Sequence, residues 1–203
     1  MIGPVYFITD PGAPLSVEEQ AMAAARGGAA VVQLRDKHAS DDEMLELARR
    51  LRGALPGDVK LVINDRVDVA VWSGCDGLHI GQGDGDVVAI RKRLGPDRIL
   101  GLSIETESQV ASIPTGYVDY IGVGPVRATA TKPDHAAPIG FDGLARIIGA
   151  AGLPAVAIGG IGPGDAGQVK LAGAEGVAVV SAISRAEDPE AAAHGLLEEW
   201  GQA

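Results

Sequence analysis

The stretch VVQLRDKHASDDEMLELARRLRGALPGDVKLVI, residues 31–63, predicts a strand, a helix and a second strand in succession. Its two ends, Val31–Leu34 and Lys60–Ile63, are short apolar runs rich in β-branched residues, as in strands that are covered on both faces. Between them, Ser40 precedes three acids and Arg49-Arg50 lie toward the end of an amphipathic run, which are the signals of a helix over Asp41–Ala54. Strand, helix and strand form the repeating unit of an α/β fold.

The same unit recurs along the whole chain. The expected strands are Val5–Thr9, Val31–Leu34, Lys60–Ile63, Gly77–Ile80, Ile99–Ser103, Tyr120–Val123, Pro154–Ile158 and Gly176–Val180. The expected helices are Ser16–Arg26, Asp41–Ala54, Val67–Trp72, Asp86–Leu94, Thr106–Ile113, Phe141–Ala150, Pro163–Leu171 and Pro189–Trp200. Eight units at a spacing of about 25 residues predict a (β/α)8 TIM barrel, with residues 1–203 as a single catalytic domain. A doubly wound open sheet is the alternative, but such sheets usually have about five or six strands.

The composition narrows the class of protein. Lys and Arg total 17 against 27 Asp and Glu, a net charge of −10, and a surface this acidic disfavours nucleic-acid or anionic-membrane partners. The first residues lack the basic segment of a signal peptide, and no apolar run approaches the roughly 18 residues of a membrane helix. The single cysteine, Cys75, excludes a disulfide framework and is expected to be a small buried hydrophobe. We therefore expect a cytoplasmic protein that acts on small molecules; the sequence leaves open whether it forms a homo-oligomer.

Polar residues gather where the expected strands end, which is the edge that carries the active site in barrels of this kind. Gln33, Arg35 and Lys37 alternate, so in an extended segment their side chains project to one side. Two cations and an amide on the rim of a barrel suit the oxygens of a phosphate group. The alternative is a solvated strand end with incidental charges.

Two carboxylates end neighbouring strands of the expected barrel. Asp65 follows the third strand and Asp84 the fourth, so the pair can share a hard cation. Magnesium usually takes one or two protein carboxylates together with substrate phosphate and water. The alternative is that each aspartate caps a helix, Asp65 the third and Asp84 the fourth.

The longest segment without periodicity is Val126–Ile139, and long loops in compact domains tend to be lids or binding loops. Thr129, Thr131 and Lys132 supply two hydroxyls and a cation there. The alternative is a flexible surface loop without a ligand.

A second phosphate site is expected after the last two strands. Gly159-Gly160 follow the seventh and Val180-Ser181 the eighth, where barrels commonly bind a phosphate on backbone N–H groups. His79 lies among apolar neighbours inside an expected strand, so we interpret it as a hydrogen-bonded core or supporting residue rather than a base.

Taken together, these motifs resemble the thiamine phosphate synthase family, also called thiamine-phosphate pyrophosphorylases. The matching stretches follow one another along almost the whole chain: Gln33–Lys37, Ile63–Ala70, Gly77–Asp84, Gly101–Ser103, Gly122–Pro125, Thr129–Lys132, Ile158–Ile161 and Val180-Ser181. The resemblance implies a transferase that joins an aminopyrimidine methyl diphosphate to a thiazole phosphate, or to its carboxylated form. The products would be thiamine phosphate and diphosphate, with Mg²⁺ as the required cofactor.

The resemblance also assigns residues by position. Those implied to hold the pyrimidine diphosphate are Gln33, Arg35, Lys37, Asn64, Ser103 and Lys132, of which Arg35, Lys37, Ser103 and Lys132 would take part in catalysis. Asp65 and Asp84 would bind the metal, and the thiazole phosphate would be held by Thr129, Thr131, Gly160, Val180 and Ser181. The thiazole nitrogen attacks with its own lone pair, so the reaction needs no base, and the diphosphate is expected to leave first or nearly so.

The chain departs from the family pattern at two places. Ile104-Glu105 stand where the family often has a small residue and a histidine, and Arg127-Ala128 stand where it often has an aromatic residue and a proline. Two rival functions are a thiazole tautomerase-like isomerase and a non-catalytic barrel that binds a phosphorylated ligand. Glu105 and the paired carboxylates argue against the first, and the complete set of cations and acids argues against the second.

Overall fold

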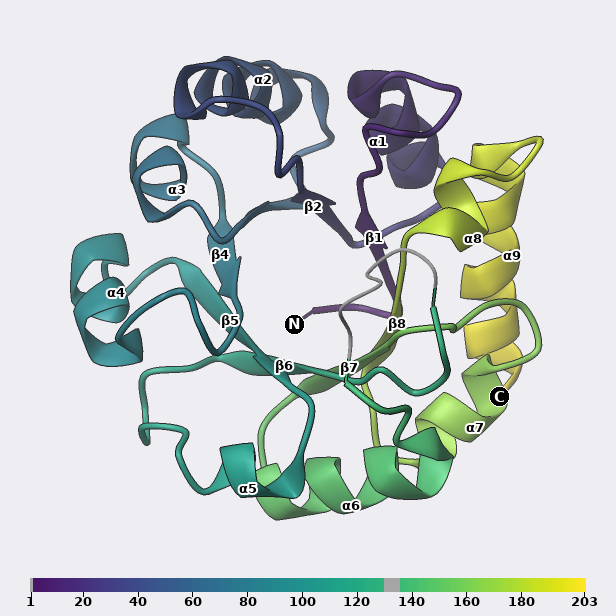
Figure 1. Ribbon diagram of the computed structural model, residues 1–203. Helices are drawn as coiled ribbons and strands as arrows, with labels where there is room; N and C mark the ends of the chain where they lie inside the picture. Colours follow the sequence, from purple (N-terminus) through teal and green to yellow (C-terminus); the bar gives the residue numbers. More distant parts are fainter. Residues whose placement is uncertain (1, 130–135) are drawn as a thin grey trace.

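The computed structural model describes residues 2–129 and 136–203. Its parallel strands close into a barrel in chain order, with each strand beside the next and the last beside the first (Figure 1). The strands are β1 Val5–Ile8, β2 Val31–Leu34, β3 Lys60–Asn64, β4 Gly77–Ile80, β5 Ile99–Ile104, β6 Tyr120–Val123, β7 Ala155–Ile158 and β8 Gly176–Val179. The closed sheet confirms the predicted (β/α)8 barrel and excludes the open sheet.

The helices lie outside the barrel, around the ring of strands (Figure 1). They are α1 Val17–Arg26, α2 Asp41–Ala54, α3 Val67–Ser73, α4 Val87–Leu94, α5 Glu107–Val110, α6 Gly140–Ala151, α7 Ala166–Leu171, α8 Ser181–Ser184 and α9 Pro189–Gln202. The first two begin with the same device: Ser16 and Ser40 each accept a hydrogen bond from the backbone of a glutamate three positions on, whose carboxylate accepts one in return. These reciprocal caps satisfy N–H groups that have no partner within a helix.

Most helix boundaries agree with the sequence prediction to within about two residues, but α5 and α7 are shorter by more than that and α8 was not predicted. The helix α5 ends at Val110 rather than Ile113, because Pro114 disfavours a helical conformation in the residue before it. The helix α7 begins at Ala166, later than predicted, because Gly164 has a φ of +90° and cannot lie within a helix. The short helix α8 was not predicted, since its four residues are too few to show a helical period.

The core has two layers. The larger lies between the strands and the surrounding helices, and it is built almost entirely from aliphatic side chains. The smaller fills the inside of the barrel with Ile2, Tyr6, Ile8, Val31, Val62, Tyr120, Val156 and Ala178. Ile2 is buried within this inner layer, so the N-terminal segment closes one end of the barrel near its axis (Figure 1). The opposite end, at the carboxyl ends of the strands, is left for a ligand.

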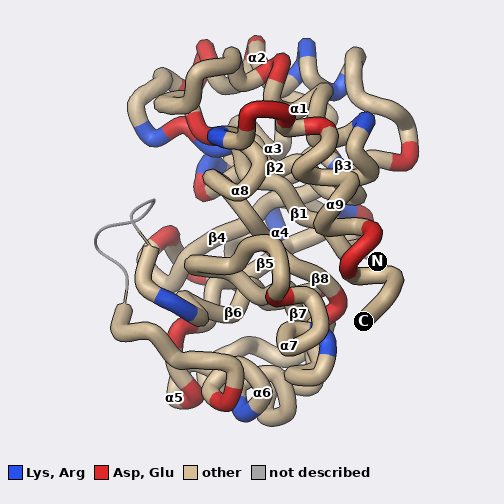
Figure 2. The backbone as a smooth tube through the Cα atoms, turned by 90° about the vertical axis from the view of Figure 1, so that its right-hand side faces the viewer, with Lys and Arg blue, Asp and Glu red and all other residues tan. Residues whose placement is uncertain are grey.

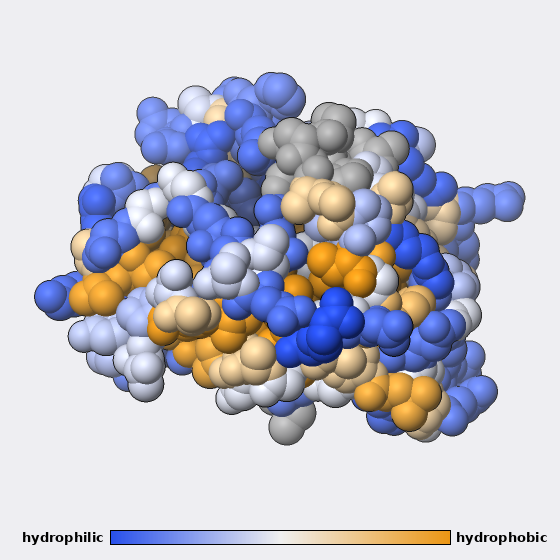
Figure 3. All heavy atoms as spheres, turned by 60° about the horizontal axis from the view of Figure 1, so that its bottom comes forward, coloured by the Kyte–Doolittle hydropathy of each residue, from blue (hydrophilic) through white to orange (hydrophobic). Residues whose placement is uncertain are grey.

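Charged residues lie mostly on the helices and loops, while the barrel strands carry few of them (Figure 2). On the face that carries α5 and α6, hydrophilic side chains cover much of the surface and apolar ones show between them (Figure 3). No helix within the described residues is both long and apolar enough to cross a membrane. Cys75 is buried, and burial raises the pKa of its thiol, which confirms its interpretation as a small hydrophobe.

Candidate active site

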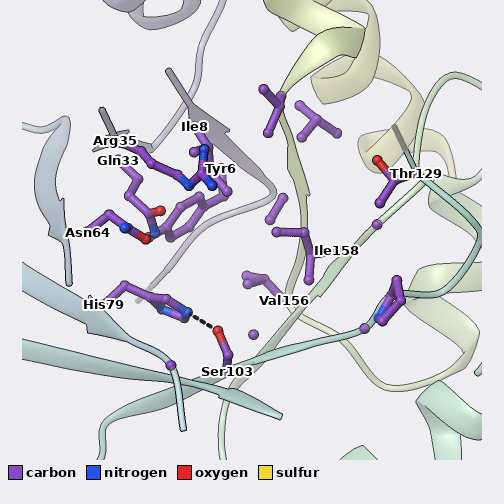
Figure 4. Close-up of a pocket in the computed structure, with 18 of the residues that line it drawn as sticks. Tyr6, Ile8, Gln33, Arg35, Asn64, His79, Ser103, Thr129, Val156 and Ile158 are labelled. Carbon is purple, nitrogen blue, oxygen red and sulfur yellow. Dashed lines mark hydrogen bonds between the residues drawn. The ribbon is translucent and has the colours of Figure 1, made fainter. Parts of the chain in front are cut away.

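A cavity of about 430 Å³ opens at the carboxyl ends of the strands. Every predicted site residue that the structure describes lines this cavity: Gln33, Arg35, Lys37, Asn64, Asp65, Asp84, Ser103, Thr129, Gly160, Val180 and Ser181. The other two, Thr131 and Lys132, lie outside the described residues. Residues from all parts of the sequence therefore meet at one end of the barrel, where Figure 4 shows several of them around the cavity.

The corner after β2 is held by a buried threonine. Thr9, at the end of β1, accepts a hydrogen bond from the backbone N–H of Arg35 at 2.9 Å and donates one to its carbonyl at 3.2 Å. Because Thr9 is fully buried, the segment that carries Arg35 and Lys37 is fixed to the neighbouring strand. The sequence analysis assigned Arg35 and Lys37 to the site, but it did not single out Thr9, which positions the segment that carries them.

The two carboxylates are held by groups beside them. Asp65 has a φ of +53°, an uncommon conformation for a residue other than glycine, and its Oδ2 accepts a hydrogen bond from Asn64 Nδ2 at 2.8 Å. Asp84 turns back so that its Oδ2 accepts from the backbone of Gly81 at 2.6 Å. Burial raises the pKa of Asp65, and the charge of Asp84 raises it further, while Lys37 opposes both. The two carboxylates therefore lie close enough to repel each other.

Neither aspartate caps a helix, so the capping alternative is wrong. The residue before α3 is Arg66, which makes no side-chain cap. The helix α4 is capped by Asp86, whose carboxylate accepts from the backbone of Ala89 at 2.7 Å. Among the described residues, no group of three or more histidine, cysteine or acidic side chains could enclose a metal ion. Any cation between Asp65 and Asp84 would have to complete its coordination with ligand oxygens and water.

A hydrogen-bonded row of side chains runs beneath the cavity: Tyr6, Gln33, His79 and Ser103 line it, and Tyr120, which is fully buried and does not line it, joins Tyr6 to His79. Gln33 Nε2 donates to Tyr6 Oη at 2.8 Å, and the hydroxyls of Tyr6 and Tyr120 lie 2.8 Å apart. Tyr120 Oη lies 2.8 Å from His79 Nδ1. His79 Nε2 lies 2.9 Å from Ser103 Oγ (Figure 4). Both tyrosines were missed by the sequence analysis because they stand inside apolar strands.

The histidine in this row is a supporting residue, as predicted. Both ring nitrogens of His79 have hydrogen-bond partners, and burial lowers its pKa to about 4. The imidazole is therefore neutral near pH 7, and neither nitrogen is free to take a proton from a substrate.

The rim beyond β6 and β7 depends on two glycines. Gly159 and Gly160 have φ values of +92° and +66°, and a Cβ on either would lie 2.5–2.7 Å from Pro125 or Arg127. Arg127 binds Asp165 through two hydrogen bonds, at 2.6 and 2.8 Å, and so ties the loop after β6 to the loop after β7. Arg127, one of the departures from the family pattern, thus has a structural partner.

Two further cavity residues were not assigned a role from the sequence. Gln82 donates to the carbonyl of Ser103 at 2.7 Å, which ties the loop after β4 to β5. Glu105 also lines the cavity, and its backbone N–H donates to Gln109 at 2.7 Å. The sequence could have indicated a role for Gln82, because this polar residue lies between the end of β4 and Asp84, at the edge where the site was expected.

The chain is similar to proteins of a known family. A family model described as thiamine monophosphate synthase matches residues 5–183. The thiamine-phosphate synthase of Psychrobacter sp. is 48% identical over 198 residues, which cover 95% of this chain and 93% of that protein. That of Chloroflexus aurantiacus is 46% identical over 195 residues, covering 95% and 90%. Among solved structures, the thiamine phosphate pyrophosphorylase from Pyrococcus furiosus matches with a TM-score of 0.88 at 32% identity, covering 98% of this chain and 95% of that one.

Proposed function

Because the chain belongs to the thiamine monophosphate synthase family, we propose that it joins an aminopyrimidine methyl diphosphate to a thiazole phosphate, giving thiamine phosphate and diphosphate. The observation that carries this proposal is the meeting of the cationic, acidic and glycine-rich strand ends in one cavity. The acidic net charge of −10 supports partners that are these small molecules rather than nucleic acid or an anionic membrane, and we propose that the enzyme is cytoplasmic.

The residues at the ends of β3 and β4 fit a magnesium ion. Within the part of the chain that the structure describes, the hydrogen bonds to Asp65 and Asp84, at 2.8 and 2.6 Å, each engage one carboxylate oxygen, so the other oxygen of each could bind a cation. Their mutual repulsion would be relieved by a cation between them. Bound Mg²⁺ would supply positive charge to the oxygens of the leaving diphosphate.

Positive side chains beside that pair suit the departing group. Arg35 and Lys37 line the cavity wall next to Asp65, and Lys132 is assigned to the same group by family resemblance. As the bond between carbon and oxygen breaks, negative charge develops on the diphosphate, and fixed cations stabilise that charge more in the transition state than in the bound substrate. Asn64 and Gln33 would hold the pyrimidine end.

The nucleophile needs no base. The thiazole nitrogen attacks through its own lone pair, and the amino group of the pyrimidine stabilises the positive methylene carbon that the departing diphosphate leaves. His79 has both nitrogens engaged and a pKa near 4, so it would not compete for protons at neutral pH. A cavity rich in phosphate ligands suits this dissociative displacement.

The thiazole phosphate would bind at the opposite side of the cavity. Gly160, Val180 and Ser181 line the cavity, and the loops after β7 and β8 would supply backbone N–H groups to the phosphate. Thr129 lines it as well, and Thr131 is assigned to the same phosphate by resemblance. The two substrates would then lie side by side over the row formed by Tyr6, Tyr120 and His79.

The direct test is diphosphate release. The purified protein is mixed with Mg²⁺ and both substrates, and diphosphate is followed with a coupled enzymatic assay. The proposal predicts release that requires both substrates and the metal. Release that ignores the thiazole phosphate would contradict it, and isomerisation of a thiazole without diphosphate release would favour the tautomerase alternative.

A further inference from the structure

We propose that Tyr6, Tyr120 and His79 form a hydrogen-bond relay of fixed direction, which makes Ser103 a donor into the cavity and the Gln33 carbonyl an acceptor. The inference rests on the proposed function for the identity of the groups met at each end. It assigns no chemical step to the relay residues themselves. They are positioning residues that act through Gln33 and Ser103.

We infer the direction from the orientation of the Gln33 amide. Its Nε2 faces Tyr6 Oη at 2.8 Å and has only protons to offer, so in this orientation Tyr6 accepts. A phenol has a single proton, and that of Tyr6 is then available to its other close partner among residues 2–129 and 136–203, Tyr120 Oη at 2.8 Å. Burial raises the pKa of both tyrosines, so both hydroxyls keep their protons.

The direction continues through the imidazole. Tyr120 accepts from Tyr6, so its own proton points to His79 Nδ1 at 2.8 Å. A neutral imidazole has one N–H, and with Nδ1 as acceptor that proton lies on Nε2. Nε2 then donates to Ser103 Oγ at 2.9 Å. Since Ser103 Oγ accepts there, its own proton remains to be donated to a ligand in the cavity.

This direction matches the chemistry of the pyrimidine diphosphate at both ends. The Gln33 carbonyl is left to accept from the amino group of the pyrimidine, and the Ser103 hydroxyl is left to donate to an oxygen of the anionic diphosphate. The reverse direction would put the Gln33 N–H groups against an amino group and a Ser103 lone pair against an anion. Unpaired donors and acceptors of that kind are costly when they are buried.

The sequence provides the room for the relay. Strand register places His79 beside Gly101, and Gly101 beside Tyr120. A Cβ at Gly101 would lie 2.2 Å from the Tyr120 ring and 2.5 Å from His79 Nδ1, and one at Gly122 would lie 3.1 Å from the His79 ring. Two strand glycines, where side chains are usual, are therefore explained by the rings that occupy their space.

The test is the tautomer of His79 in the ligand-free protein at pH 7.5. The chain has four histidines, and two-bond proton–nitrogen spectra of ¹⁵N-histidine-labelled protein distinguish a proton on Nε2 from one on Nδ1. The relay predicts Nε2–H for His79, assigned by its contacts to the Tyr120 ring and by its loss in His79→Gln. A proton on Nδ1, or a mixture of tautomers, would overturn the proposal.

A variant tests whether the direction matters for the reaction. Tyr120→Phe removes the donor to Nδ1, so the His79 spectrum should show both tautomers and kcat should fall about tenfold with KM changed less than about twofold. The matched control is Tyr117→Phe, in the loop before β6 and outside the relay, which should leave the spectrum and kcat as in the parent protein. A purely structural role for Tyr120 predicts lower stability with an unchanged His79 tautomer and kcat, and that result would also overturn the proposal.

Failure of the relay and failure of the proposed function give different results. A protein with Nε2–H on His79 that releases no diphosphate would refute the function but retain the direction of the relay. A protein that releases diphosphate with Nδ1–H on His79 would refute the relay alone. The tautomer is measured without substrate, so it does not depend on activity.

Discussion

Replacing Gly101 with alanine tests whether the aromatic row really fills the inside of the barrel. The added Cβ would lie 2.2 Å from Tyr120 Cζ and 2.5 Å from His79 Nδ1, against about 3.5–4.0 Å for a comfortable contact. Neither ring can move freely, because Tyr120 is bound to Tyr6 and His79 to Ser103. Overpacking of this kind costs about 1–3 kcal/mol, and a broken hydrogen bond adds about 1 kcal/mol.

The sum, about 3 kcal/mol, corresponds to a fall in Tm of about 6–12 °C for a chain of this size, measured by circular dichroism. The control is Gly149→Ala in α6, where a Cβ meets nothing within 4 Å. That variant should gain about 0.5–1 kcal/mol, because alanine favours a helix more than glycine does. A Gly101→Ala protein that melts with the parent protein would refute the packing described for the barrel floor.

Three further predictions concern the proposed metal site, the pH dependence of stability and the rim of the cavity. Asp84→Asn should lower turnover about 10²–10³-fold with Tm almost unchanged. The control Asp58→Asn, at the opposite end of the barrel, should leave turnover and Tm unaltered. An equal loss of stability and activity in Asp84→Asn would contradict the placement of Asp84 at the cavity. Burial lowers the pKa of His79 to about 4 in the folded protein, against about 6.5 in the unfolded chain. The contribution of the neutral imidazole to the free energy of unfolding is therefore complete above about pH 6.5. It falls by at most about 3 kcal/mol as the pH is lowered toward about 4. Urea unfolding of the parent protein and of His79→Gln across that pH range isolates this contribution. If the free energies of unfolding of the two proteins changed in parallel with pH, the expected contribution of His79 would be refuted. Arg127→Ala leaves the carboxylate of Asp165, whose side chain is 8% exposed, without its cation. We expect the free energy of unfolding to fall by about 1–2 kcal/mol and the KM for the thiazole phosphate to rise. An unchanged KM would show that the Arg127–Asp165 ion pair does not shape the rim of the cavity.

The fold was largely predictable because its determinants are local. Each strand is a short apolar run covered on both faces, and the helices α1 and α2 begin with serine caps that can be recognised from spacing alone. The errors fell where the deciding feature is a single residue or a very short element. Pro114 shortens α5, and the four residues of α8 are below the length at which periodicity can be detected.

The site was predictable to the extent that its residues stand at strand ends, where polar side chains interrupt apolar runs. Asp65, Asp84 and Arg35 were found in this way, and all three line the cavity. Of the relay residues, His79 was predicted as a supporting residue, but the two tyrosines were not found, because Tyr6 and Tyr120 lie within apolar runs and look like ordinary core residues. A glycine inside a strand was the available signal, since such a glycine often marks the close approach of another group.

We propose that carboxylates and cations fixed around the mouth of the barrel would hold a metal-bound diphosphate. It is tested most directly by a crystal grown with Mn²⁺ in place of Mg²⁺ and soaked with the pyrimidine diphosphate, with data collected at the manganese absorption edge. We expect an anomalous peak between Asp65 and Asp84, with diphosphate oxygens completing its coordination and Arg35 in contact with the same diphosphate. A diphosphate bound with no peak between those carboxylates, or a peak elsewhere in the molecule, would refute the proposed metal site.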